Sequence, residues 1–253
     1  MGNRMVRANE TQTSRHVPVA VLCGGRGTRL GVLGVATPKP LVEVGGAAIV
    51  THVLRLYARH GFRRFVLCLG HRAAEVEAYF GGTSNAAPAG CEIELVDTGD
   101  DVSTGARVAR VRDRLGDSTF AVTYADGVGA IDLAAALEFH HGHGAVGTVT
   151  GTHPRSPYGH LDLDGVVVRS FDEKPVLHDV WVSAGFFWFE PEFFEYLDEN
   201  PACVLETEPL RKLAADGELR VFRHGGPWQA MDTLADHVEL EDRWQRDDPP
   251  WKL

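Results

Sequence analysis

The 253-residue sequence has little of what three large classes of protein require. It has no hydrophobic run of transmembrane length, and its first 16 residues lack the apolar core of a secretion signal. Its formal net charge is −10, so it has no general excess of cations for binding nucleic acid or an anionic membrane. Any affinity for a phosphorylated ligand must therefore come from a local group of basic residues.

Cysteine is scarce as well. Cys23, Cys68, Cys91 and Cys203 are widely spaced and form no C-x-x-C pair. Three of them fall in apolar, strand-like runs, which favours buried structural thiols over a redox or metal site. We therefore expect reduced cysteines and a cytoplasmic location.

The rest of the composition is that of an ordinary globular protein, with 44% hydrophobic and 24% charged residues. A chain of this length can bury a sizeable core. No internal repeat, low-complexity segment or linker divides it. We expect a disordered polar tail over residues 1–16 and one domain over residues 17–253.

Short apolar runs alternate with helical patterns through the first half of the chain. Strands are predicted over residues 17–23, 41–44, 65–69, 92–96 and 119–124, and helices over residues 49–60, 73–80, 104–115 and 132–143. A strand–helix alternation of this kind indicates parallel strand pairing. The sequence thus predicts an α/β fold.

The second half is richer in short β-runs. Strands are predicted over residues 146–150, 160–163, 166–171, 181–190 and 219–223, and helices over residues 191–197, 205–215 and 233–244.

The most informative stretch follows the first apolar run and reads G-G-R-G-T-R-L, then seven residues, then P-K-P. Glycines let backbone N–H groups approach a bound anion, while arginine and lysine add charged donors. A plain strand-to-helix connection is the alternative, but such turns seldom carry so many cations. A dinucleotide-binding turn fits badly, because Leu30 takes the place of its third small residue. The candidate phosphate-binding residues are Gly24, Gly25, Arg26, Gly27, Thr28, Arg29 and Lys39.

Two aspartates are candidate metal ligands. Asp126 follows a predicted strand, at the sheet edge where open α/β folds place their chemistry, and a carboxylate there is suited to Mg²⁺. An Asp-Gly pair is equally typical of a simple turn. Asp232 precedes the last helix, where it could serve as an N-cap, as a metal ligand or as both.

Three histidines, His140, His141 and His143, close the helix over residues 132–143. No cysteine or carboxylate completes a coordinating pattern with them, so a polar helix end explains them better than a metal site. Further along, Glu173-Lys174-Pro175 follows a predicted strand. In isolation this tripeptide indicates only a surface turn.

The glycine-rich motif resembles the activating loop of sugar-1-phosphate nucleotidyltransferases. Within that family the pattern is most similar to the glucose-1-phosphate cytidylyltransferases. The likeness extends to residues 38–46, 96–100, 124–128, 170–175, 185–187 and 228–233, and to the tail over residues 250–252.

The resemblance implies a Rossmann-like fold with a mixed, mostly parallel central sheet flanked by helices, and a smaller β-rich region at the acceptor site. It implies transfer of CMP from CTP to a sugar 1-phosphate, in a homo-oligomer, with Mg²⁺ held by Asp126 and Asp232. Arg29 would stabilise the leaving pyrophosphate, Lys39 would bridge phosphates of both substrates, and Lys174 would contact the sugar phosphate. The further substrate-binding residues that it implies are Thr104, Gly105, Tyr124, Glu173, Ser183 and Gly185.

Several positions depart from the family pattern and bear on the acceptor. Ala125 replaces a glycine, Ala130 replaces an acidic residue, and Ser183-Ala184-Gly185 stands where Asn-Gly-Gly reads sugar hydroxyls. The loop over residues 81–90 is also shorter. A serine hydroxyl has less reach than an asparagine amide, so the acceptor could be another hexose 1-phosphate, a cyclitol phosphate or a phosphonate. Another nucleoside triphosphate, or a non-catalytic nucleotide sensor, are the remaining alternatives.

Overall fold

The central element of the structure is strand β1 (Pro18–Leu22), all five residues of which are buried. A strand that is covered on both faces has no need of polar residues, and this explains its uninterrupted apolar sequence. Val19 and Val21 point into one core with α3 (Ile49–Arg59) and α7 (Leu133–His143), and Ala20 and Leu22 point into a second core with α5 (Thr104–Arg110). The computed structural model describes residues 14–82 and 86–251.

The sheet has seven strands in the order β12-β8-β11-β6-β1-β4-β5. Parallel pairs join β4, β1 and β6, as well as β5 with β4 and β12 with β8, whereas β11 runs antiparallel to both of its neighbours. The predicted mixed, mostly parallel α/β sheet is confirmed. The remaining strands of the sheet are β4 (Arg64–Leu69), β5 (Glu92–Asp97), β6 (Phe120–Tyr124), β8 (Gly147–Thr152), β11 (Val182–Phe189) and β12 (Leu219–Arg223).

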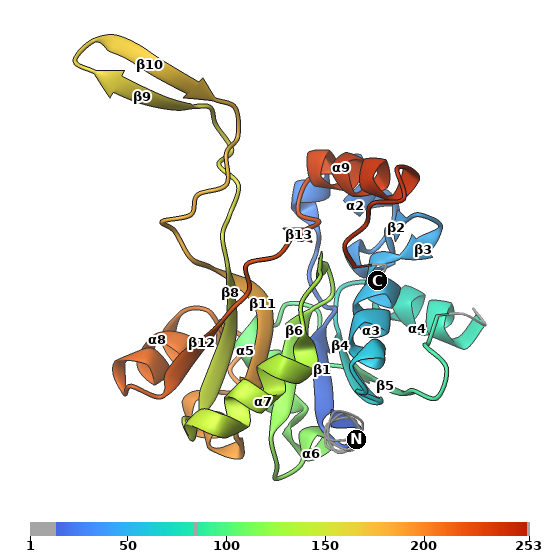
Figure 1. Cartoon of the computed structure of the whole chain (residues 1–253). Helices are drawn as coiled ribbons and strands as arrows, with labels where there is room; N and C mark the ends of the chain where they lie inside the picture. Colours follow the sequence, from blue (N-terminus) through green and yellow to red (C-terminus); the bar gives the residue numbers. More distant parts are fainter. Residues whose placement is uncertain (1–13, 83–85, 252–253) are drawn as a thin grey trace, which may run out of the picture.

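Helices cover both faces of this sheet, and several short elements frame its carboxyl edge (Figure 1). The other α-helices are α2 (Val32–Ala36), α4 (Ala73–Gly82), α6 (Arg112–Leu115), α8 (Glu208–Ala215) and α9 (Leu234–Gln245). The short elements are the 3-10 helices η1 (Thr28–Leu30), η2 (Lys39–Leu41) and η3 (Pro191–Tyr196), and strands β2 (Glu43–Val44), β3 (Ala47–Ala48), β7 (Gly127–Gly129) and β13 (Trp228–Ala230).

Four predicted elements differ from those observed. The strand expected over residues 41–44 is η2 followed by β2, and the helix expected over residues 104–115 breaks at Val111 into α5 and α6. The segment after Pro191 is a 3-10 helix rather than an α-helix, and α8 begins at Glu208 rather than at residue 205. Strands β7 and β13 are not predicted at all, because three-residue strands carry no periodic signal.

Residues 153–181 leave the sheet as a long arm that ends in a hairpin of β9 (His160–Asp164) and β10 (Val167–Asp172) (Figure 1). Every residue of the two strands is exposed. An isolated two-stranded hairpin is marginally stable in water, so this one is expected to pack against something else. Its exposed apolar residues include Leu161, Leu163, Val167, Val168 and Phe171.

Most of the expected tail, residues 1–13, lies outside the described residues. Ser14 is buried, and its hydroxyl donates to the carbonyl of His60 at 3.0 Å. This end of the segment therefore contacts the domain. Among the described residues, no helix is long and apolar enough to cross a membrane.

The histidines at the end of α7 belong to a small hydrogen-bond network. His140 Nδ1 and His143 Nε2 lie 2.8 and 2.7 Å from the hydroxyl of Thr148 on β8. Burial lowers the pKa of His140 to about 4, with His143 and His141 adding to the effect. The three histidines thus lie at the C-terminal end of α7, and two of them are engaged by Thr148.

Two cysteines, Cys23 and Cys68, are buried, as predicted. Cys68 lies in β4, and burial raises the pKa of its thiol to about 12. Burial likewise raises the pKa of Cys23, which directly follows β1. Both thiols are therefore protonated at neutral pH, which suits packing rather than redox chemistry.

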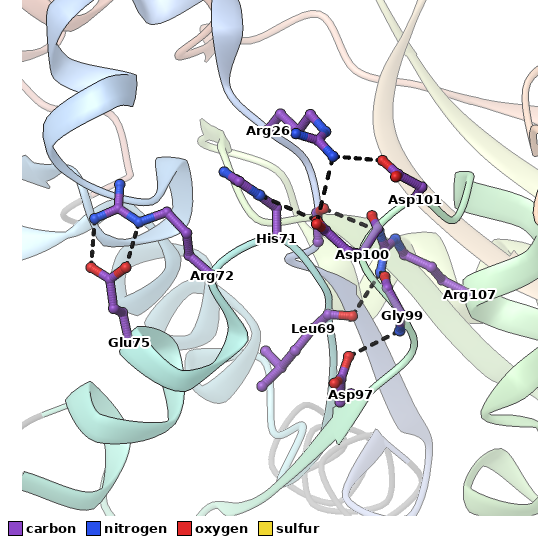
Figure 2. A network of polar contacts seen from close by, with 11 residues as sticks. Arg26, Leu69, His71, Arg72, Glu75, Asp97, Gly99, Asp100, Asp101 and Arg107 are labelled. Carbon is purple, nitrogen blue, oxygen red and sulfur yellow. Dashed lines mark hydrogen bonds and ion pairs between the residues drawn. The ribbon is translucent and has the colours of Figure 1, made fainter.

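A single buried guanidinium joins the carboxyl ends of three strands. Arg107, on α5, is 3% exposed, and its two terminal nitrogens donate to the carbonyls of Leu69, Gly99, Gly24 and Asp100 and to the hydroxyl of Thr98 at 2.6–3.1 Å (Figure 2). Burial lowers the pKa of Arg107, but an arginine remains charged. Its side chain thus fixes the ends of β1, β4 and β5 to α5.

We predict that Arg107→Met lowers the free energy of unfolding by about 3 kcal/mol, because it removes the five hydrogen bonds that a buried charged group donates to the ends of three strands. Urea unfolding followed by circular dichroism measures this. Arg55→Met, on the exposed side of α3, is the matched control and should change the stability little. Equal stability of the Arg107 variant and this control would contradict the role assigned to the guanidinium.

Candidate active site

A cleft of about 630 Å³ opens at the carboxyl ends of β1 and β6. Open α/β sheets bind their ligands at this edge. The cleft brings together thirteen of the sixteen residues singled out from the sequence. They are Gly24, Gly25, Arg26, Gly27, Thr28, Arg29, Lys39, Thr104, Tyr124, Asp126, Ser183, Gly185 and Asp232.

Two glycines of the loop are required by close packing. Gly27 has φ +62°, and a Cβ atom there would lie 2.9 Å from the Cβ of Lys39. A Cβ at Gly24 would lie 2.2 Å from the guanidinium carbon of Arg107. The loop therefore depends on glycine both for its own turn and for the approach of two cationic side chains.

Lys39 lies at the centre of the charged groups in the cleft. Its Nζ is in contact with Oδ2 of Asp126 and lies 2.8 Å from Oδ1 of Asp232. Arg29 also approaches Oδ1 of Asp232, at 2.8 Å. The Lys39 and Asp126 side chains are only 15% and 18% exposed, whereas that of Arg29 is 70% exposed. Lys39 is thus held in place, and Arg29 is open to solvent.

The two aspartates meet through a short antiparallel ladder between β7 and β13. Asp126 immediately precedes β7, Asp232 closely follows β13, and the N–H of Met231 donates to the carbonyl of Asp126 at 3.0 Å. Thr233, not Asp232, caps α9, in a capping box with Asp236. The capping role considered for Asp232 is therefore wrong, and its carboxylate faces Lys39 instead.

Burial and neighbouring charges shift the pKa values of Lys39 and Asp126 in opposite directions. Burial alone would lower the pKa of Lys39, but Asp126 and Asp232 outweigh it, so the pKa is raised and the ammonium form persists. Burial raises the pKa of Asp126, Lys39 opposes that shift, and Asp232 adds to it. The two carboxylates repel each other and depend on a cation between them.

Asp126 and Asp232 fit a divalent cation. One ammonium nitrogen contacts both carboxylates, which shows that their oxygens converge on a common point. Mg²⁺ is usually bound by one or two carboxylates together with substrate phosphates and water. Two carboxylates at the floor of an open cleft match that pattern.

Arg26 is committed to other carboxylates in this structure. Its guanidinium lies 2.6 Å from Asp101 and 3.5 Å from Asp100, and His71 also approaches Asp100 (Figure 2). All of these side chains are substantially exposed, so the ion pairs are weak and exchangeable. Arg26 can turn to a phosphate only by leaving these partners.

Thr104 and Tyr124 share one partner that sequence reasoning missed. The hydroxyl of Tyr124 donates to Oε1 of Glu206, and the hydroxyl of Thr104 donates to Oε2 at 2.7 Å. Burial and Glu206 together raise the pKa of Tyr124. Gly105 does not line the cleft, because it packs against Cys203 beneath it.

Ser183 and Gly185, on β11, form another wall of the cleft, here called the Ser183 wall. Gly185 has φ +80°, and a Cβ there would lie 2.3 Å from the ring of Tyr124. The N–H of Gly185 donates to the Ser183 hydroxyl at 3.2 Å, so this hydroxyl is engaged by its own strand. Ala125 lines the cleft but is 4% exposed.

Glu173 and Lys174 lie elsewhere. They follow β10 in the hairpin arm, and no residue of the arm lines the cleft. Lys174 adopts φ +49°, an uncommon conformation for a residue other than glycine. Their proposed contact with a substrate phosphate remains a prediction.

A family model described as nucleotidyl transferase matches residues 19–229 of the chain. The chain belongs to the nucleotidyl transferase family. A glucose-1-phosphate cytidylyltransferase from Salmonella typhi is 39% identical over 251 residues, which cover 92% of this chain and 97% of that protein. A mannose-1-phosphate guanylyltransferase from Mycobacterium tuberculosis is 29% identical over 231 residues, covering 89% of this chain and 64% of that protein.

Solved structures share the fold of this nucleotidyltransferase at low sequence identity. A UTP-bound UGPase from Acinetobacter baumannii has a TM-score of 0.73 at 16% identity, with 92% of this chain and 94% of that chain covered. HddC from Yersinia pseudotuberculosis has a TM-score of 0.69 at 18% identity, with 90% and 99% covered. The expected nucleotidyltransferase fold is confirmed.

We predict that Lys39→Met destabilises this nucleotidyltransferase by about 2 kcal/mol near pH 7.5, because it leaves two neighbouring carboxylates without their cation. A carboxyl group whose pKa is raised in the folded state binds its proton more tightly when folded. The deficit should therefore shrink as the pH falls from 8 towards 5. Thermal unfolding across this pH range measures it.

The exposed Lys212→Met is the matched control, since its ammonium lies over the ring of Tyr196 and not beside a carboxylate. Millimolar Mg²⁺ should raise the melting temperature of the Lys39 variant more than that of the unmodified protein. A pH-independent deficit would contradict the electrostatic account.

Proposed function

We propose that this nucleotidyltransferase transfers CMP from CTP to a sugar 1-phosphate, foremost α-D-glucose 1-phosphate, and releases pyrophosphate. The observation that carries the proposal is Lys39 held between Asp126 and Asp232 at the rim of a glycine-rich loop. The 39% identity to a glucose-1-phosphate cytidylyltransferase supports the choice of nucleotide and acceptor.

The proposed reaction mainly requires that the two substrates are positioned and that the charge on their phosphates is stabilised. A phosphate oxygen of the acceptor is already anionic, so it can attack the α-phosphorus without a general base. Backbone N–H groups of the loop and the exposed Arg29 would hold the triphosphate, and Arg29 would stabilise the charge that develops on pyrophosphate. Lys39 would neutralise charge between the two substrates.

Asp126 and Asp232 are proposed to hold Mg²⁺, which when bound neutralises phosphate charge and orients the triphosphate. In this proposal Lys39 contacts the incoming phosphates once the two carboxylates have another cation.

The acceptor is the less constrained part of the proposal. Ser183 stands where the related enzymes read sugar hydroxyls, and its hydroxyl is engaged by the N–H of Gly185. A contact to glucose is thus weakened, which favours testing other hexose 1-phosphates, cyclitol phosphates and phosphonates beside it.

We also propose a cytoplasmic location. The support is Cys23, a buried free cysteine at the cleft.

We also propose that the protein is a homo-oligomer in which a second copy covers the hairpin. The support is the exposed apolar surface of β9 and β10 on an arm that makes no part of its own cleft. Contact with another copy would stabilise a hairpin that is marginal alone. It would also give Lys174 a route to a substrate phosphate.

We expect turnover of CTP with glucose 1-phosphate and Mg²⁺, measured as pyrophosphate release across five nucleoside triphosphates and a panel of sugar 1-phosphates. Asp126→Asn should lower kcat by about 10³-fold or more, because it removes charge that balances the cation. Asp117→Asn, an exposed carboxyl outside the cleft, is the control. Undiminished activity of the Asp126 variant would refute its role.

We expect Phe171→Glu to shift the protein towards monomer in sedimentation velocity, because it places charge on the apolar surface of β10. Val238→Glu, on exposed α9, controls for loss of an apolar surface residue. An oligomer unaffected by the Phe171 change would show that the hairpin is not the contact.

A further inference from the structure

Glu206 is the one acidic side chain in the described part of the cleft that is held by hydroxyl groups rather than by a cation. Its two carboxyl oxygens accept from Tyr124 and Thr104 respectively. By contrast, Asp126 and Asp232 both contact Lys39. Within residues 14–82 and 86–251 Glu206 forms no ion pair with lysine, arginine or histidine. It therefore presents negative charge to any ligand in the cleft.

A carboxylate of this kind cannot face a phosphate. The repulsion between like charges in a partly desolvated cleft would oppose binding. Each carboxylate oxygen can accept more than one hydrogen bond and can donate none when ionised. The part of a substrate beside Glu206 must therefore be uncharged and must carry N–H or O–H donors.

Glu206 is held against the first turn of α5. The N–H of Ala106 donates to the carbonyl of Cys203 at 3.1 Å, and the N–H of Leu205 donates to the hydroxyl of Thr104 at 3.0 Å. Gly105 has no room for a Cβ, which would lie 2.7 Å from the sulfur of Cys203. The segment before Glu206 is thus packed directly on the first turn of α5.

The same helix packs on the glycine-rich loop. Arg107, one turn after Thr104, donates to the carbonyl of Gly24 at 3.1 Å. A chain of contacts thus runs from Gly24 through Arg107 and Thr104 of α5 to Glu206, and it links the glycine-rich loop to this carboxylate. A nucleotide whose phosphates lie on the loop would extend its base towards α5.

We infer that Glu206 is a specificity-determining residue that accepts a hydrogen bond from the exocyclic amino group of the cytosine base. This inference rests on the proposed use of CTP. Cytosine and uracil differ at position 4, where one carries an amino donor and the other a carbonyl acceptor, and a carboxylate accepting from the cytosine amino group is a recognised pairing. With uracil, two acceptors would face each other. Thr104 and Tyr124 act as positioning residues for the carboxylate.

The test compares CTP with UTP in the unmodified enzyme and in Glu206→Gln. A glutamine amide can donate to the uracil carbonyl, so the ratio of kcat/KM for CTP over UTP should fall by at least about tenfold. Glu208→Gln is the matched control, because Glu208 begins α8 outside the cleft. It should leave the ratio unchanged.

An equal loss for both triphosphates in Glu206→Gln would overturn the inference. So would a change confined to the KM of the sugar phosphate, which would assign the carboxylate to a sugar hydroxyl. Thr104→Val keeps the carboxylate but removes one anchor, and it should lower the same ratio by a smaller factor. This variant serves if Glu206→Gln does not fold.

Calorimetric titration of CTP and UTP with Mg²⁺ separates this inference from the proposed function. If the unmodified protein turns over no acceptor, the proposed reaction fails, and the binding preference still reports on Glu206. A preference for CTP that Glu206→Gln abolishes would support the inference. A preference that survives the substitution would refute it, whether or not the enzyme is active.

Discussion

The hydrogen bonds of the Arg107 guanidinium are the constraint on which the cleft depends. Strands β1, β4 and β5 end at the same edge of the sheet, where the backbone carbonyls of Leu69, Gly24, Gly99 and Asp100 converge on α5. One fork of donors satisfies these four carbonyls and ties them to α5. Because the carbonyl of Gly24 accepts one of these hydrogen bonds, the same guanidinium also holds the start of the glycine-rich loop in a fixed position relative to the sheet.

The second requirement of the site is a cation between two aspartates that lie far apart in the sequence. The ladder between β7 and β13 brings Asp126 and Asp232 together, and Lys39 then neutralises them. Net charge cannot supply this arrangement, since the protein as a whole is acidic. The cations in the cleft are therefore a local feature, namely Arg29 and Lys39 beside the glycine-rich loop.

Patterns among residues that are close in the sequence predict much of the fold and part of the candidate site. The buried run of β1, the glycine loop and the position of Asp126 after β6 follow from residues adjacent in the sequence. Arg107 and Glu206 carry no such signal, because each looks like an ordinary residue near the start of a helix and acquires its role only through partners on other elements. The ladder of β7 and β13 was missed for the same reason.

The placement of Lys174 shows another limit of sequence reasoning. The sequence predicts a strand followed by Glu-Lys-Pro, but it does not show in which direction the exposed hairpin leaves the sheet. The sequence therefore predicts strand β10 but does not show what the hairpin or Lys174 contacts.

The distribution of charge in the cleft limits how a nucleotide can lie in it. Arg29 and Lys39 are at the end formed by the glycine loop, whereas Glu206 is held by Thr104 and Tyr124 against α5. A molecule with a polyanionic end and an uncharged, donor-bearing end is favoured in one direction and opposed in the other. In the proposed mode of binding, this distribution of charge sets the orientation of the nucleotide. Gly185 packs against the ring of Tyr124, and the Tyr124 hydroxyl holds Glu206, so the Ser183 wall, formed by Ser183 and Gly185, is linked to the same carboxylate.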